Sequence, residues 1–172
     1  TLLEKYYFEY KPPTNHGPEF PDAGLELKTT GVIRDKDGRC RAKERLVLTM
    51  INYEVISREQ WDTSYFFGKC RMMLILFYLF AKDVPVFDRR FVLAPLIYKM
   101  SVEDQEVIKR DWNTIRQKVL EGKAHELSEG DTFYLGACRK GSGGEGEALQ
   151  KQPCSSELAK SRAFSFKQGY VN

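Results

Sequence analysis

The chain has 172 residues, 42% of them apolar and 13% aromatic, which is enough to bury one core as a single domain spanning residues 1–172. The longest unbroken apolar run covers residues 72–81 and is too short to cross a bilayer, so a membrane protein is not expected. Two histidines and four cysteines without Cys-x-x-Cys spacing argue against a zinc site, and with no secretory signal they predict reduced thiols in a cytoplasmic protein.

The first hundred residues are predicted to be mainly strands. In chain order we expect a helix end at 2–10, a loop at 11–21, and strands at 25–30, 45–53, 72–80 and 90–100. The Asp-Lys-Asp-Gly sequence at 35–38 predicts a hairpin turn. The apolar run 72–80 is typical of a central strand covered on both faces. Pro95 is expected to interrupt or end the strand at 90–100.

The second part of the chain begins with a clear helix. Ser101 and Asp104 resemble a capping box, and Gly122 is placed as the C-cap. Apolar residues recur between them at helical spacing: Ile108, Trp112, Ile115 and Val119. Beyond the helix we expect a strand at 132–138, a Gly-rich linker at 141–146 and a short element of undetermined type at 161–170. This order of elements predicts a mixed α/β fold with a central sheet.

Positive charge is concentrated in two stretches, although the net charge is only +3. Residues 34–45 hold six basic residues against three acidic ones, and the same ratio holds from 139 to the end. Both stretches could face phosphate groups. Charge alone favours the alternative, a pair of solvated loops.

Glu26 and Lys28 are two residues apart on the predicted strand 25–30, so their side chains share one face. Hydrolysis of a phosphodiester needs a divalent cation held by carboxylates, and a neighbouring lysine can assist the attacking water. Glu19 and Asp22 are the candidates for the second carboxylate. Taken alone, the Glu-x-Lys pattern also fits a surface pair on a strand.

Several sequence blocks resemble the MutH family, which comprises the mismatch-repair endonuclease MutH and type II restriction enzymes that cut at GATC. The block DAGLELKT at 22–29 resembles the family's catalytic core. The others follow in the same order: LLEKY at 2–6, AKERLVL at 42–48, WDTS at 61–64, GKAHELSEGDT at 122–132, YLGAC at 134–138 and RAFSFK at 162–167. The resemblance covers almost the whole chain, and the late blocks are similar to the restriction-enzyme branch.

The resemblance implies a PD-(D/E)XK nuclease: an α/β fold with a restriction-endonuclease-like core, in which helices flank a central mixed β-sheet. By this resemblance Glu26 is a metal ligand, Lys28 the catalytic lysine, Glu4 a helix glutamate near the metals, and Lys69 a further active-site lysine. The family's first ligand is an aspartate that follows a proline, and here Glu19 stands at that position. We expect Glu19 to be the ligand, with Asp22 as its substitute.

Family likeness also points to residues that contact DNA. Arg139 and Lys140 match the loop that takes part in base recognition, where they would contact either guanine or a phosphate. Ser165 stands where MutH has a tyrosine that senses adenine methylation, and Lys167 matches a phosphate contact. We therefore expect these four residues to face double-stranded DNA.

These observations predict a Mg²⁺-dependent type II restriction endonuclease that cleaves double-stranded DNA, with GATC as the expected target. Two alternatives stay open: a MutH-like effector domain that binds DNA without cutting, and a mismatch-repair nicking endonuclease. We expect the chain to be the N-terminal catalytic part of a longer protein with a second MutH-like domain, and a dimer on DNA is possible within this scheme.

Overall fold

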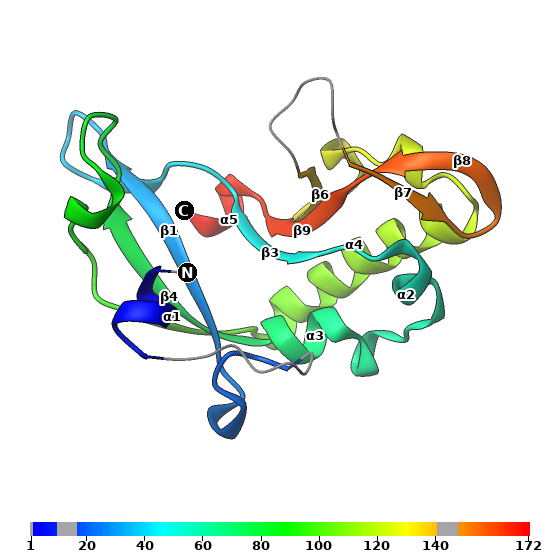
Figure 1. Cartoon of the computed structure of the whole chain (residues 1–172), viewed down its shortest axis with the longest axis horizontal. Helices are drawn as coiled ribbons and strands as arrows, with labels where there is room; N and C mark the ends of the chain where they lie inside the picture. Colours follow the sequence, from blue (N-terminus) through cyan, green and yellow to red (C-terminus); the bar gives the residue numbers. More distant parts are fainter. Residues whose placement is uncertain (1, 10–16, 141–147) are drawn as a thin grey trace.

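The computed structural model describes residues 2–9, 17–140 and 148–172, which form two lobes, each built on its own sheet (Figure 1). The predicted Gly-rich linker at 141–146 and most of the loop at 11–21 lie outside the described residues. In the described part of the chain, no helix is both long and apolar enough to span a membrane.

The first lobe contains a four-stranded mixed sheet in the order β2-β1-β4-β5. Its strands are β1 (Glu26–Arg34), β2 (Cys40–Ala42), β4 (Met72–Leu79) and β5 (Leu96–Lys99). The central pair, β1 and β4, is parallel, whereas β2 and β5 join antiparallel at the two edges. The sheet confirms the predicted mixed α/β architecture.

Local sequence signals explain the turns of this sheet. The β1–β2 hairpin was predicted, and Asp35 fixes it by accepting hydrogen bonds from the N–H groups of Asp37 and Arg39 at 3.0 and 2.9 Å. Strand β5 is shorter than expected because it begins after Pro95, whose missing N–H suits a strand boundary. In β4 the predicted burial on both faces is wrong, since Met73 and Ile75 are buried and the other residues are half-buried.

The second lobe contains a sheet that the sequence did not predict as separate. Its order is β3-β9-β6, formed by β3 (Leu46–Met50), β9 (Arg162–Phe166) and β6 (Leu135–Arg139), all antiparallel. A hairpin of β7 (Leu149–Gln152) and β8 (Ser155–Lys160) extends from it. The undetermined element at 161–170 is therefore β9 followed by the short helix α5 (Gln168–Val171).

Helices cover both sheets. They are α1 (Leu2–Tyr6), α2 (Tyr53–Arg58), α3 (Tyr65–Cys70) and α4 (Val102–Leu120), with 3-10 turns at Pro21–Ala23 (η1), Trp61–Thr63 (η2), Val86–Asp88 (η3), Ala124–Glu126 (η4) and Glu129–Asp131 (η5). In Figure 1 the long helix α4 runs behind the second lobe. Its predicted apolar face, with Trp112 at the centre, is buried in the core against Trp61 and the neighbouring strands.

The ends of α4 follow their predicted caps with one change. Ser101 Oγ accepts from the N–H of Asp104 at 3.1 Å. The reciprocal half of the predicted capping box, in which the Asp104 carboxylate would accept from the N–H of Ser101, does not form in the described part of the chain. Gly122 adopts φ of +70°, and a Cβ there would come within 2.7 Å of Cys154 O.

Asp111, in the middle of α4, fixes the start of β6. Its buried carboxylate accepts hydrogen bonds from three successive backbone N–H groups, those of Phe133, Tyr134 and Leu135, at 2.6–2.9 Å. The helix thereby determines where β6 begins and, four residues on, where Arg139 ends the strand.

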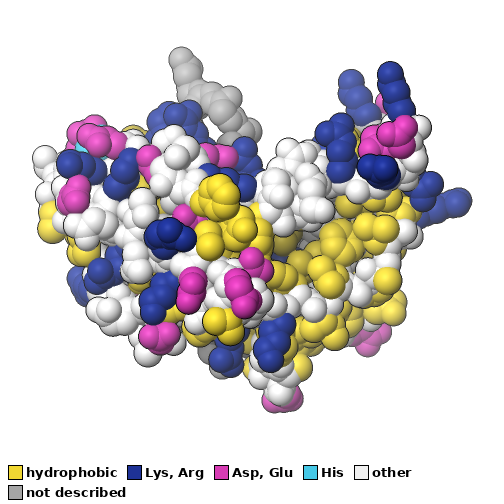
Figure 2. All heavy atoms as spheres, turned by 180° about the vertical axis from the view of Figure 1, so that it is seen from behind, with side chains coloured by type: hydrophobic (Ala, Val, Ile, Leu, Met, Phe, Trp, Pro, Cys, Tyr) yellow, Lys and Arg dark blue, Asp and Glu magenta, His cyan; other side chains and the backbone are white. Residues whose placement is uncertain are grey.

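Seen from behind, the two lobes differ in surface character. Figure 2 shows hydrophobic side chains gathered over the lobe of the four-stranded sheet, with Lys and Arg side chains standing at its upper end. Exposed apolar residues of this lobe include Phe87, Phe91 and Ile97.

Candidate active site

Glu26 opens β1 and lies buried, with 0% of its surface exposed. Just before it the chain folds back, because Phe20 and Leu25 exchange backbone hydrogen bonds. The turn lays Glu19 along the start of β1. The N–H of Glu19 donates to Glu26 Oε2 at 3.3 Å, and Glu19 Oε2 accepts from the N–H of Leu27 at 3.0 Å.

Two lysines face this pair of carboxylates. Lys28 lies on the same face of β1, as predicted, with its Nζ 2.5 Å from Glu26 Oε1. Lys69 reaches in from α3, with its Nζ 3.4 Å from Glu26 Oε1 and 3.9 Å from Glu19 Oε1. The structure thus brings together Glu19, Glu26, Lys28 and Lys69, which we call the carboxylate–lysine cluster.

The two carboxylates of the cluster titrate differently. Burial, followed by the hydrogen bond with Glu19, raises the pKa of Glu26 to about 7, although Lys28 acts in the opposite direction. Burial acts to raise the pKa of Glu19 too. The hydrogen bonds from Glu26 and from the N–H of Leu27, with both lysines nearby, hold it below the usual glutamate value. The pair therefore shares one proton near neutral pH.

The charge of Lys69 is stabilised by the same carboxylates. Burial alone would lower the pKa of Lys69, but Glu26 and Glu19 raise it above the ordinary lysine value. The ammonium also lies 5.7 Å from the ring centroid of Tyr65. The cluster therefore keeps a fixed positive charge beside its shared proton.

This donor set fits a magnesium ion. Mg²⁺ usually takes one or two carboxylates and completes its octahedron with water and phosphate oxygens. A divalent cation would replace the proton that Glu19 and Glu26 share. Among the residues that the structure describes, no group of three or more Asp, Glu, His or Cys side chains could hold a metal ion. Water and substrate oxygens would have to supply the other ligands.

The other two acidic residues predicted for the site, Asp22 and Glu4, have different surroundings. Asp22 is exposed on the 3-10 turn η1, where it starts the loop that returns to β1. Glu4 is half-buried in α1, and Leu3 and Tyr6 of this helix, with Tyr7 just after it, line an apolar cavity that extends to β1. The geometry favours Glu19 over Asp22 as the partner of Glu26, and the role of Glu4 stays a prediction.

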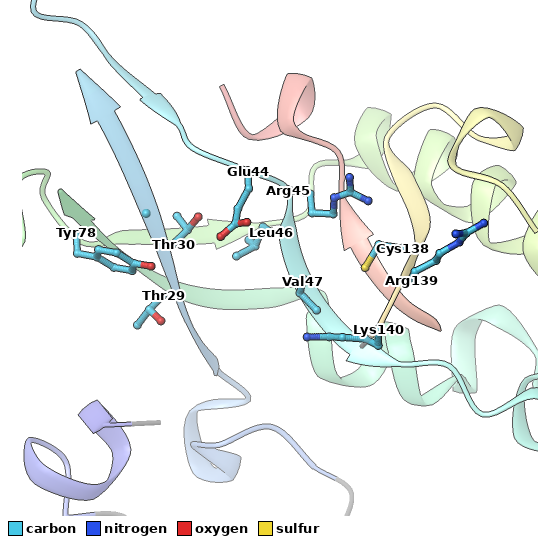
Figure 3. A pocket seen from close by; sticks show the side chains of 11 residues that line it. Thr29, Thr30, Glu44, Arg45, Leu46, Val47, Tyr78, Cys138, Arg139 and Lys140 are labelled. Carbon is cyan, nitrogen blue, oxygen red and sulfur yellow. The ribbon is translucent and has the colours of Figure 1, made fainter. Parts of the chain in front are cut away.

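A polar cavity of about 460 Å³ lies between the two sheets (Figure 3). Residues 29–31 of β1, directly after Lys28, form one wall, and residues from β3 and β6 form the opposite one. Arg139 and Lys140, both predicted to contact DNA, are exposed at this cavity. Figure 3 shows Lys140 directed toward β1, whereas Arg45 and Arg139 extend away from it.

The two remaining predicted DNA contacts differ in accessibility. Lys167 is half-buried, donates a hydrogen bond to Thr132 O, and lines a neighbouring cavity that also includes Arg45. Ser165 is 1% exposed in the middle strand of the second sheet, where it pairs with Val47 and Gly136. Its side chain is therefore covered by protein and is not presented to a ligand.

Two residues at the cavities were not singled out from the sequence. Arg45 was counted only as part of the basic stretch 34–45, and Glu129 only as part of a block of family likeness. They form an ion pair with each other. The sequence did contain a signal for Arg45, since a basic residue immediately before a buried strand lies at the edge of the sheet, where it can reach a ligand.

A mixed sheet whose central strand carries a glutamate and a lysine on one face, beside a polar cavity, defines a restriction-endonuclease-like fold. Comparison with known families agrees. The family model described as DNA mismatch repair enzyme MutH matches residues 8–111, a span that includes the whole carboxylate–lysine cluster. The chain belongs to the MutH family.

Individual relatives come from both branches of this family. The chain is 42% identical over 167 residues to the type II restriction enzyme Sau3AI of Staphylococcus aureus, covering 96% of this chain and 34% of that protein. It is 24% identical over 127 residues to the DNA mismatch repair protein MutH of Yersinia pestis (strain Pestoides F), covering 74% of this chain and 54% of that protein. The chain thus spans about a third to a half of these relatives.

Proposed function

We propose that this chain is the catalytic domain of a Mg²⁺-dependent, site-specific DNA endonuclease of the type II restriction class. The observation that carries the proposal is the carboxylate–lysine cluster, in which Glu26 contacts Glu19, Lys28 and Lys69 at once. Membership of the MutH family and the similarity to a type II restriction enzyme support DNA as the substrate.

In the proposed mechanism each member of the cluster has one task. Glu19 and Glu26 would hold the cation, which would supply Lewis-acid chemistry by polarising the scissile phosphate and lowering the pKa of a bound water. Lys28, salt-bridged to Glu26, lies on the face from which the water approaches and orients it. Lys69 offsets the negative charge that grows on the phosphate as the bond breaks.

We propose that the DNA lies against the two lobes, with its backbone at the cavity between the sheets. This cavity adjoins Lys28 along β1 and carries Arg139 and Lys140 on its far wall, where a basic side chain can contact a base edge or a phosphate. We assign GATC as the target because the sequence resembles the branch of the family that cuts there. A cytoplasmic location, a dimer on DNA and a second MutH-like domain are further expectations of the same assignment.

One observation favours a second candidate function. Glu19 occupies the position where the family carries an aspartate, and its extra methylene changes where a cation with strict octahedral geometry would lie. A domain that binds DNA without cutting it is therefore the alternative. The third possibility, nicking in mismatch repair, draws on the similarity to MutH proteins.

One assay separates the three. The protein is incubated with Mg²⁺ and plasmids that carry unmethylated, hemimethylated or fully methylated GATC. Double-strand cleavage of GATC DNA by the protein alone supports the restriction function. Nicking that is confined to hemimethylated DNA and requires an added partner protein would indicate repair. Binding without cleavage of any plasmid would indicate the effector.

A further inference from the structure

Arg45 lies where three polar cavities meet. The cavity between the sheets measures about 460 Å³, and two neighbouring ones measure about 700 and 610 Å³. Of the described residues that line these cavities, Arg45 alone lines all three. Its guanidinium is therefore positioned to meet a ligand that extends from one cavity into the next.

The backbone leading to Arg45 is fixed by both lobes. Residues 43–45 connect β2 of the first sheet to β3 of the second. The N–H of Lys43 donates to Gly31 O at 2.9 Å, and the Gln168 amide donates to Ala42 O at 2.7 Å. The Arg45 side chain itself stays 41% exposed, so it can reorient without disturbing the fold.

Glu129 holds Arg45 in the absence of a ligand. The two side chains form an ion pair, and Glu129 is 40% exposed. The position of Glu129 is fixed because the turn η5 has a complete capping box. The Asp131 carboxylate accepts from the N–H of Ser128, and Ser128 Oγ accepts from the N–H of Gly130. Lys118 further anchors Asp131 at 2.8 Å.

The groups around this ion pair are mostly basic. Arg139 lines two of the three cavities with Arg45, and Lys43 and Lys167 line the third. A guanidinium donates its paired N–H groups to a carboxylate or to a phosphate with the same geometry. An exposed ion pair contributes little to stability, so exchanging its carboxylate for a phosphate costs little.

We propose that Arg45 binds a phosphate of the DNA backbone at the junction of the three cavities, and that Glu129 occupies this position until DNA displaces it. This inference rests on the proposed function and adds a binding residue to it. Arg45 acts on affinity and contacts the backbone, so its contribution is independent of base sequence.

The test measures DNA binding without cleavage, by fluorescence anisotropy in EDTA across a series of salt concentrations, on duplexes with and without GATC. Glu129→Gln is expected to tighten binding roughly two- to fivefold at low salt, since it removes a competing carboxylate. Arg45→Gln is expected to weaken binding to both duplexes and to reduce the slope of log K against log salt by about one. Arg45→Lys should retain most of the affinity, because a phosphate accepts either cation.

The controls separate a local exchange from a general charge effect. Glu121→Gln removes an equally exposed carboxylate paired with Lys123, on the outer side of α4 away from the three cavities. Glu121→Gln should change DNA affinity less than Glu129→Gln does. In the Arg45→Gln background, Glu129→Gln should have no effect on DNA affinity. An equal effect of Glu129→Gln with and without Arg45, or a lower melting temperature with unchanged affinity, would overturn the proposal.

This binding experiment and the Mg²⁺ cleavage assay together distinguish this inference from the proposed function. In one outcome, the wild-type protein cuts GATC DNA with Mg²⁺ while Glu129→Gln and Arg45→Gln bind DNA as the wild type does. That result contradicts only the role of Arg45. Wild-type protein that binds neither duplex contradicts both.

Discussion

At the scale of single residues, the contact between Glu26 and Glu19 makes the site sensitive to pH. The pKa of Glu26 is raised from the ordinary 4.5 to about 7, so its contribution to stability is complete below pH 4.5 and is lost as the pH rises through about 7. The pKa of Glu19 is lowered, so its contribution is lost only as the pH falls into the acidic range. Between pH 5 and 7, Glu26 is the group that changes.

We therefore predict that Mg²⁺ binding strengthens as the pH rises to about 7 and then levels off. Below that value the cation must displace the proton on Glu26, so affinity should fall by about tenfold for each pH unit. Calorimetric titrations of Mg²⁺ between pH 5.5 and 8.5 would measure this slope. Affinity that is flat across this range would show that the two carboxylates do not share a proton.

Lys28 provides the second prediction at this scale. Lys28→Ala should reduce Mg²⁺-dependent cleavage by about 10²- to 10⁴-fold, since it removes the group that orients the attacking water. DNA affinity should change only a few-fold. Single-turnover cleavage would measure the first effect and anisotropy the second, with exposed Lys123→Ala as the control. A loss of cleavage fully explained by weaker binding would argue against a catalytic role.

The sequence predicted part of this site for a simple geometric reason. Glu26 and Lys28 share a face because they are two apart on a strand, and the structure shows their ion pair. The approach of Lys69 depends on how α3 packs against β1, which spacing alone does not reveal. Ser165 illustrates the limit of transferring a position by likeness, because here the surrounding strands bury it.

At the scale of elements, predictions from local patterns were the more accurate. The helix at 102–120 was identified from its apolar spacing and caps, and the first hairpin from its turn sequence. The second sheet was missed because β3 pairs with β9 across more than a hundred residues, Leu46 opposite Phe166. Five-residue strands carry too little periodicity to reveal such a partner.

Asp111 is the element-scale feature that we expect to matter most. Asp111→Ala leaves three N–H groups at the start of β6 without their acceptor, one in a buried and two in part-buried hydrogen bonds, and it should lower the free energy of unfolding by about 3 kcal/mol. Urea denaturation would measure the loss, with exposed Asp62→Ala as a control expected to stay within about 0.5 kcal/mol. Equal stability of the two variants would contradict the anchoring role given to Asp111.

At the scale of the whole molecule, the arrangement of two sheets places the parts of the site. The first lobe holds the carboxylate–lysine cluster, with Glu26 and Lys28 on β1 and Lys69 on α3, and the second lobe supplies the basic residues across the polar cavity. The linker at 43–45 joins the two lobes beside this cavity. Under the proposed function, the cleavage chemistry belongs to the first lobe and the DNA contacts belong to the second.

The most direct test of this account is Mg²⁺-dependent cleavage of a GATC duplex by wild-type protein and by Glu26→Gln, a variant that keeps the size of the side chain but cannot carry its charge. We predict cleavage at GATC by the wild type, and DNA binding with a loss of cleavage of at least about 10²-fold for Glu26→Gln. Equal cleavage by the two proteins would contradict the assignment of the carboxylate–lysine cluster as the active site.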